Sequence, residues 1–467
     1  MKKTLTLVLL FFTICSFSQD ISGCWSGLLE FPGGKLTLVF NIQKSENGYT
    51  ATMDSPDQGV KDIPMDHVTF ENNKTITLEI SQAKIIYTAD LDASGKFIGN
   101  FSQSGSALPM NIIHSTPIVQ AKPNRPQEPK APFPYYVEDV TFENKKENFT
   151  LAGTLTLPKK EGKFPVVVLI TGSGPENRNS EILGHKPFLV IADYLTRNGI
   201  GVLRFDDRGV GQSKGDLLHA TTQSFAGDVA AAVDYLKTRK DINTKKIGLI
   251  GHSEGGAVAP MVAANNKDIN AIVLLAGTGI PGDQLLLQQN YLIGRAAGMT
   301  EAELEVSKKT NLQIYNVVEN EKDLVTAKKQ LTEILTKSYT SLPKEQQPSE
   351  AEITAIVSQQ ADQMLYPWMA FFLKYDPATA LTNVKCPVLV LNGAKDLQVP
   401  PKENTEAIKN TLDKAGNKKV TVKIFPNLNH LFQECETGAF EEYEKIEQTF
   451  SPDVLKFMFD WLTVQFK

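Results

Sequence analysis

The sequence predicts an α/β protein in which a parallel sheet carries an inserted helical cap and follows a small all-β domain. Three observations carry this prediction. Short β-type runs fill the first quarter of the 467 residues, a proline-rich stretch follows them, and continuous apolar runs then alternate with helical stretches. With 41% hydrophobic and 22% charged residues, a chain of this length can build two or three domains, each with its own core.

Residues 1–18 predict a signal peptide rather than a part of the fold. Two lysines precede an apolar run from Leu5 to Ile14, about half the ~20 residues that a membrane-spanning helix needs. Small residues favour cleavage after Ser18, so we expect an exported protein, periplasmic or extracellular. A lipoprotein anchored at Cys15 is the alternative, which Ile14 disfavours because a small residue is expected before the lipidated cysteine.

Residues 19–115 predict an all-β accessory domain, either a barrel or a sandwich. Short runs rich in Val, Ile, Thr, Phe and Tyr are punctuated by turn sequences, with no helical stretch between them. The runs are Trp25–Glu30, Leu36–Gln43, Tyr49–Asp54, Thr75–Ile80, Ile85–Leu91 and Phe97–Gln103. The domain is interpreted either as a glycan- or lipid-binding module or as a structural appendage, and the lack of a charged or aromatic cluster favours the appendage.

Residues 116–135 predict a linker between two domains. Six prolines in this short span favour an extended, polyproline-like chain. We therefore expect a semi-rigid spacer that ends where residues 136–467 begin.

Residues 136–467 predict a sheet of parallel strands with helices on both faces. Apolar runs alternate with helical stretches, which is typical of strands buried on both sides, and residues 137–157 should add antiparallel strands. The apolar runs are Phe164–Ile170, Gly201–Phe205, Lys246–Ile250, Ala271–Ala276, Pro387–Leu391 and Val420–Phe425. The helical stretches are Lys186–Asn198, Gln223–Lys237 and Ala257–Asn265.

Four further helices interrupt this alternation over residues 281 to about 376. They are predicted at Asp283–Ala297, Thr300–Glu319, Asp323–Lys337 and Ser349–Met364. Thr300 with Glu303, and Ser349 with Glu352, have the sequence of a capping box. Helices inserted between two strands are interpreted as a cap, and the alternative is a helical elaboration without a gating role.

A candidate nucleophile lies in the segment Gly251-His252-Ser253-Glu254-Gly255. The segment follows a predicted strand and precedes a predicted helix, which is the context that a G-x-S-x-G turn requires. Glycines belong there because the turn is too sharp for flanking side chains. We predict that Ser253 attacks the substrate and that His252 either packs beside it or supports the oxyanion side.

The candidate base and acid follow in the order that this architecture uses. Only His430 comes after Ser253 among the six histidines, and it follows the last predicted strand by a short loop. Asp396 follows the apolar run Pro387–Leu391 and can orient the imidazole. Asp376 is a rival for the acid, but it comes before that strand rather than after it.

The backbone amides of Ser173 and Glu254 are the predicted oxyanion hole. Ser173 lies in the glycine-rich loop after Phe164–Ile170, and Glu254 begins the helix behind the nucleophile. Trp368, Phe371 and Phe372 could line an acyl pocket or form the core of the cap. The charged segment that starts at Arg204 is interpreted as a structural ion-pair network.

Charge and composition narrow the classes of molecule that we expect the protein to bind. The net charge of −5 gives no electrostatic footprint for nucleic acid, and no apolar stretch after residue 18 reaches the length of a membrane span. No cysteine or histidine cluster suggests a metal, so we expect neither a metal nor a cofactor. The sequence carries no signal for an oligomeric state.

Several of these segments together resemble the α/β-hydrolase superfamily, and the mature chain resembles exported bacterial serine carboxylesterases with an N-terminal β domain. They are Thr171-Gly172-Ser173-Gly174-Pro175, Gly184-His185-Lys186-Pro187-Phe188, Asp206-Asp207-Arg208-Gly209, Gly251-His252-Ser253-Glu254-Gly255-Gly256 and Pro367-Trp368. The resemblance implies cofactor-free cleavage of small-molecule esters, with short acyl chains. Thr171 departs from the pattern, because many members of the superfamily carry histidine there.

The expected function is therefore that of a secreted carboxylesterase with a Ser253–His430–Asp396 triad. A serine peptidase or aminopeptidase of the same fold is the first alternative, because it needs the same triad and glutamates of the cap could bind a free amino terminus. A binding protein with a vestigial hydrolase is the second, and the complete triad argues against it.

Overall fold

The protein divides into two compact units, Met1–Ala121 and Lys122–Lys467, in the computed structural model. The structure describes residues 20–31, 34–45, 48–58, 60–81, 83–103, 106–115 and 124–467. The predicted signal peptide, residues 1–18, and the first part of the predicted linker, residues 116–123, lie outside the described residues.

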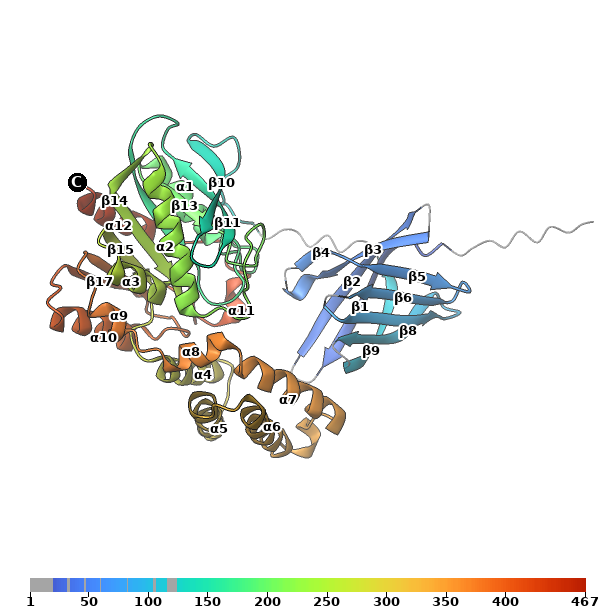
Figure 1. The fold of residues 1–467 in the computed structure, drawn as a ribbon. Helices are drawn as coiled ribbons and strands as arrows, with labels where there is room; N and C mark the ends of the chain where they lie inside the picture. Colours follow the sequence, from blue (N-terminus) through green and yellow to red (C-terminus); the bar gives the residue numbers. More distant parts are fainter. Residues whose placement is uncertain are drawn as a thin grey trace, which may run out of the picture. The chain divides into compact units, whose positions relative to one another are not determined.

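The N-terminal unit is one antiparallel sheet of nine strands (Figure 1). The strands are β1 (Gly23–Phe31), β2 (Gly34–Ser45), β3 (Gly48–Ser55), β4 (Val60–Pro64), β5 (His67–Glu71), β6 (Thr75–Ile80), β7 (Ile85–Leu91), β8 (Lys96–Gln103) and β9 (Ser106–Ser115). Their order in the sheet is β4-β3-β2-β1-β9-β8-β7-β6-β5, and β3 also contacts β5, so the sheet curls into a half-barrel. The prediction of a small all-β domain is confirmed.

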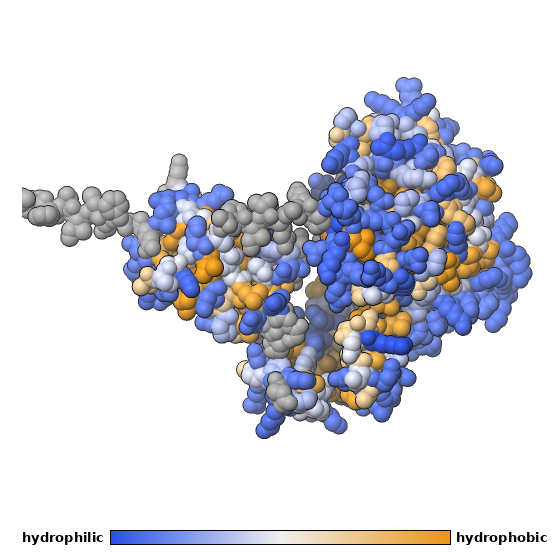
Figure 2. Space-filling model, turned by 180° about the vertical axis from the view of Figure 1, so that it is seen from behind, coloured by the Kyte–Doolittle hydropathy of each residue, from blue (hydrophilic) through white to orange (hydrophobic). Residues whose placement is uncertain are grey.

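The half-barrel encloses its own hydrophobic core. Side chains alternate along strands such as β7, where Ile85, Tyr87 and Ala89 are buried and Ile86 and Thr88 are exposed. Trp25, Phe40 and Tyr87 are among the buried core residues. A few apolar side chains lie on the outside, Leu28, Ile86, Ile98 and Ile113 among them, and Figure 2 shows hydrophobic residues scattered between hydrophilic ones on this unit.

The C-terminal unit is built on an eight-stranded sheet in the order β10-β11-β13-β12-β14-β15-β16-β17. The strands are β10 (Tyr136–Asn144), β11 (Phe149–Leu157), β12 (Phe164–Ile170), β13 (Gly201–Phe205), β14 (Ile242–His252), β15 (Ile269–Leu275), β16 (Val388–Gly393) and β17 (Val420–Phe425). β10 and β11 are antiparallel strands, and the six strands from β12 to β17 run parallel to one another, as predicted.

Helices cover both faces of this sheet. One hydrophobic core joins it to α2 (Thr222–Thr238), α3 (Gly255–Asn265) and α10 (Pro401–Lys414), and a second core joins it to α1 (Pro187–Arg197) and α12 (Pro452–Gln465). The central strands are therefore buried on both sides, which explains their unbroken apolar sequences. All parallel strands end at one edge, where the loops that carry function meet.

The predicted cap is present between β15 and β16. Its helices are α4 (Gly282–Ala296), α5 (Glu301–Asn320), α6 (Leu324–Thr340), α7 (Glu350–Met364), α8 (Pro367–Lys374) and α9 (Ala378–Leu381). Both predicted capping boxes form, at Thr300 and at Ser349. Helices α4 to α7 form a layer apart from the sheet, with α8 between them and the sheet edge (Figure 1). No helix in the described part of the chain is long and apolar enough to cross a membrane.

Candidate active site

Ser253 occupies a strained turn between β14 and α3. Its φ is +54°, in the left-handed region that residues with a Cβ rarely adopt, and its amide donates to the Leu275 carbonyl of β15 at 2.9 Å. A Cβ on Gly251 would collide with the Gly255 carbonyl, and one on Gly255 with the Ile170 carbonyl. The two glycines are thus required for the turn that lifts Ser253 to the edge of the sheet.

His430 and Asp396 come together in the loops that follow β17 and β16. His430 Nδ1 lies 2.8 Å from Asp396 Oδ2, and both side chains are buried. The other carboxylate oxygen, Asp396 Oδ1, accepts from the amides of Gln398 and Val399 at 2.8 and 2.9 Å. Because the carboxylate fixes the ring and accepts the hydrogen bond from Nδ1–H, the Nε2 lone pair of His430 is free to accept a proton.

His252 joins the serine turn to the histidine turn. Its Nε2–H donates to the backbone carbonyl of His430 at 2.9 Å, and the two rings are 4.7 Å apart. Burial lowers the pKa of His252 to about 3, so its ring is neutral near pH 7. His252 was predicted to pack beside the nucleophile, and this hydrogen bond gives it a definite partner.

The glycine-rich loop after β12 lies against Ser253. A Cβ built on Gly172 would be 3.3 Å from the Ser253 Cβ and 3.0 Å from Glu176 Oε1, so the loop backbone approaches the serine closely. Within the described residues, the amides of Ser173 and Glu254 donate no hydrogen bond. Two free N–H groups therefore remain in the two segments that flank Ser253, as an oxyanion hole requires.

The Glu254 side chain connects the serine turn to α2 and to the cap. Its Oε1 accepts from Thr222 Oγ1 at 2.5 Å and from Trp368 Nε1 at 2.8 Å, while the buried Oε2 has no partner among the described residues. Burial raises the pKa of Glu254 to about 7, the two hydrogen bonds oppose this shift, and the charge of Glu176 adds to it.

Two more acidic side chains gather at this edge, and the sequence interpretation missed the cluster. Asp207 accepts from Thr171 Oγ1 at 2.6 Å and from the Glu176 amide at 3.0 Å, and burial raises its pKa well above the ordinary value. Glu176 bonds with Ser180, and burial raises its pKa too. Glu176, Asp207 and Glu254 each follow one of three neighbouring parallel strands, which is the signal that could have placed them together.

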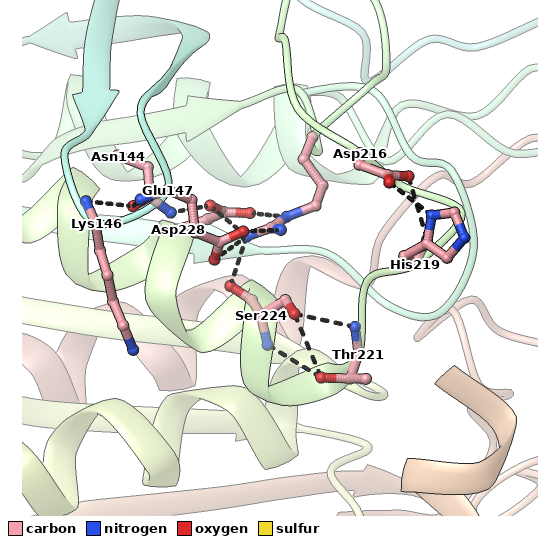
Figure 3. A network of polar contacts seen from close by, with 9 residues as sticks. Asn144, Lys146, Glu147, Asp216, His219, Thr221, Ser224 and Asp228 are labelled. Carbon is pink, nitrogen blue, oxygen red and sulfur yellow. Dashed lines mark hydrogen bonds and ion pairs between the residues drawn. The ribbon is translucent and has the colours of Figure 1, made fainter. Parts of the chain in front are cut away.

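Asp206 and Arg208 of the charged segment form ion pairs, as interpreted, whereas Asp207 does not and Arg204 donates to the Asn179 side chain instead. Asp206 pairs with Arg178 at 2.7 Å. Arg208 pairs with Asp228 and Glu147 at 2.7 and 2.8 Å and donates to the Ser224 carbonyl. Figure 3 labels these three partners. These contacts fasten the loop after β13 to α2 and to the β10–β11 hairpin, so they support the site without lining it.

The three aromatic residues predicted for an acyl pocket have different surroundings. Trp368 stacks on Phe372 with centroids 5.1 Å apart, and its indole N–H reaches Glu254. Phe372 is buried against Leu285 of α4. Phe371 stacks on Tyr375 and packs against the sheet core. Trp368 is thus tied by a hydrogen bond to Glu254 of the serine turn.

Comparison with known families decides the class of the protein. A family model described as serine aminopeptidase, S33, matches residues 186–436, which is more than half of the chain and includes the serine turn, Asp396 and His430. The chain belongs to this S33 family. The predictions of an α/β-hydrolase fold and of a serine hydrolase are thereby confirmed.

The S33 chain is also similar to bacterial and archaeal proteins. It is 26% identical to esterase EstD of Thermotoga maritima over 361 residues, which cover 76% of this chain and 71% of EstD. It is 27% identical to the uncharacterized protein YfhR of Salmonella typhi over 187 residues, 35% of this chain and 60% of YfhR. A solved esterase structure from Pyrococcus furiosus superposes with a TM-score of 0.44 and 17% identity, covering 71% of this chain and 92% of that one.

Proposed function

We propose that this protein is a serine carboxylesterase with Ser253 as nucleophile, His430 as base and Asp396 as the acid that orients the base. The observation that carries the proposal is the buried His430–Asp396 hydrogen bond, which His252 ties to the serine turn. A neutral imidazole whose Nδ1 proton is held by a carboxylate is the arrangement that activates a serine hydroxyl.

The proposed reaction has two half-reactions. Ser253 Oγ attacks the ester carbonyl carbon while its proton passes to His430 Nε2, and the Ser173 and Glu254 amides donate to the oxyanion. The oxyanion collapses, the C–O bond breaks, and the alcohol leaves with the proton from His430. Water then attacks the acyl-enzyme by the same steps, which releases the carboxylic acid and restores Ser253.

Short acyl chains are the proposed substrates. The Trp368–Glu254 hydrogen bond fixes a large indole beside the residue that follows Ser253, and we expect this indole to limit the length of the acyl group. The similarity to a protein named as an esterase, EstD, supports the choice of esters over amides.

Aminopeptidase activity is a second candidate, favoured by Glu176 and by the family description. A free amino terminus needs a carboxylate, and Glu176 Oε1 lies beside the loop that flanks Ser253. Burial, however, raises the pKa of Glu176 and so favours its uncharged form, which is a poorer partner for an ammonium group.

A substrate panel separates the two candidates. Nitrophenyl esters of increasing acyl length would be compared with aminoacyl nitroanilides, using the full-length protein and its Ser253→Ala variant. We expect the highest kcat/KM for short esters, little turnover of amides, and no turnover by the variant. Faster cleavage of aminoacyl amides than of esters would replace the esterase proposal by the aminopeptidase one.

We also propose that the protein is exported and matures by cleavage after Ser18. The lysines and the short apolar run at the start of the sequence support this proposal. N-terminal sequencing of the protein from the cell envelope or medium should find Gln19 first. An N-terminus still carrying Met1, or a lipid on Cys15, would contradict it.

A further inference from the structure

The first described residues after the boundary between the two units are fastened to the hydrolase unit. The guanidinium of Arg125 donates to the backbone carbonyls of Leu183, Glu444 and Ile446 at 3.1, 2.8 and 2.8 Å. Burial lowers the pKa of Arg125, while nearby acidic residues favour its charged form. The N–H groups of this guanidinium thus join two loops that are about 260 residues apart in the sequence.

Gln127 makes a second attachment two residues later. Its Oε1 accepts from the amides of Thr449 and Phe450 at 2.6 and 3.0 Å, and its Nε2 donates to the Phe450 carbonyl at 2.7 Å. Arg125 and Gln127 therefore hold two parts of loop 443–451, which runs from the last residue of α11 (Phe440–Tyr443) to the residue before α12.

That loop encloses a buried histidine outside the triad. His185 Nε2–H donates to the Tyr443 carbonyl at 2.8 Å, and its Nδ1 accepts from Thr449 Oγ1 at 3.0 Å. Burial lowers the pKa of His185 to about 4, so the ring is neutral near pH 7. Gln433 lies against the same ring and donates to the Gln448 carbonyl at 3.1 Å.

Gln433 closes the turn that carries His430. Asn429 Oδ1 accepts from the amides of Leu431 and Gln433 at 3.0 and 2.9 Å, and Asn429 Nδ2 donates to Gln433 Oε1 at 2.9 Å. The Ser451 amide, from the held loop, donates to the Phe432 carbonyl at 2.8 Å. Loop 443–451 therefore supports the histidine turn on one side and is held by Arg125 and Gln127 on the other.

We propose that residues 124–128 act as a strap for the catalytic histidine, with Arg125 and Gln127 as positioning residues. The proposal rests on the proposed role of His430. The strap acts through loop 443–451: when it is released, the turn 429–433 loses its support, and His430 Nε2 shifts relative to Ser253 Oγ. Displacement of a base by ~1 Å can cost as much as about 100-fold in rate, whereas substrate binding need not change.

The test compares Arg125→Ala, Arg125→Lys and Gln127→Ala in the full-length protein. Arg295→Ala is the matched control, because Arg295 is an exposed arginine on α4 of the cap. We expect kcat on a short ester to fall by about 10- to 100-fold in Arg125→Ala and less in Gln127→Ala, with KM changed by no more than about twofold. Added guanidinium at millimolar concentration should restore part of kcat in Arg125→Ala alone.

A role in stability alone would lower the melting temperature without lowering kcat of the folded protein. Circular dichroism therefore accompanies each assay, and Gln127→Ala serves as the readout if Arg125→Ala does not fold. Parent-like kcat in folded Arg125→Ala or in Gln127→Ala overturns the strap. His430→Ala distinguishes the two proposals. If His430→Ala is inactive and the strap variants are fully active, only the strap is refuted. If His430→Ala is active, the proposed base is refuted.

Discussion

Ser253 is held in a backbone conformation that serine rarely adopts, and the protein loses stability by keeping it. A φ of +54° strains any residue with a Cβ, whereas glycine is free of this strain. We therefore expect Ser253→Gly to be more stable than Ser253→Ala by roughly 0.5–1 kcal/mol, although both variants are inactive. Chemical denaturation measures the difference, and an alanine variant of equal or greater stability would contradict the strained turn.

Glu254 makes stability depend on pH in a defined direction. Because burial raises its pKa from the ordinary 4.5 to about 7, the uncharged carboxyl favours the folded state below pH 4.5, and this contribution is lost as the pH rises through 7. Glu254→Gln keeps the acceptor for Thr222 and Trp368 without the charge. We expect it to raise the free energy of unfolding above pH 7 by on the order of 1–3 kcal/mol and to have little effect near pH 4.5.

Denaturation at several pH values tests this prediction. Glu406→Gln is the control, because Glu406 is exposed on α10. A gain for Glu254→Gln that is the same at pH 4.5 and pH 8, or a gain for the control as large, would show that ionisation of Glu254 is not the cause.

At the scale of single residues, the sequence predicts those parts of the site that follow from a short motif or from the order of residues along the chain. Ser253, Asp396 and His430 follow from a strand–turn–helix motif and from chain order, and the structure brings Asp396 and His430 into contact. The burial of Glu176 and Asp207 beside Glu254 depends on which strands are neighbours. That information is tertiary, so the charged segment was interpreted as ion pairs throughout.

At the scale of elements, α8 joins the cap to the serine turn through Trp368. Replacing the indole by alanine removes the wall proposed to limit the acyl chain, so Trp368→Ala should raise kcat/KM for longer esters relative to short ones. Tyr366→Ala is the control, because Tyr366 is an exposed aromatic residue just before α8. An acyl-length profile identical to that of the parent would remove Trp368 from the pocket.

The elements themselves were predictable where periodicity is strong. The four predicted cap helices lie within a few residues of α4 to α7, because capping boxes and amphipathic spacing are local signals. Strands β4, β5 and β9 were not predicted individually. β4 is mostly exposed and ends in Pro64, and Pro109 lies within β9, so neither strand has the clean alternation of a buried one.

At the scale of the whole molecule, the position of the boundary between the two units predicts which residues the hydrolase needs for full activity. The C-terminal unit starts at Lys122, and Arg125 and Gln127 bind loops of the hydrolase. We expect a chain of residues 122–467 to keep the kcat of the full-length protein on a small ester, and a chain of residues 136–467 to lose about 10-fold or more. Equal kcat for the two folded chains would show that residues 122–135 are dispensable.

The linker shows where composition alone is a poor guide. Its prolines favour an extended chain, and a semi-rigid spacer was expected over residues 116–135. Over residues 124–135 the chain is instead part of the hydrolase unit, because Arg125 and Gln127 satisfy backbone groups of loops that lie more than 50 residues away in the sequence. Hydrogen bonds of this kind leave no pattern in a single sequence.

The central claim, that Ser253 forms an acyl-enzyme with help from His430 and Asp396, is tested most directly by mass spectrometry of the protein after reaction with a fluorophosphonate. We expect one adduct per chain, on the peptide that contains Ser253, no adduct in Ser253→Ala, and labelling slowed by at least about 100-fold in Asp396→Asn, because a neutral amide can hold the wrong tautomer of His430. An adduct on another residue, or full labelling of Ser253→Ala, would contradict the account.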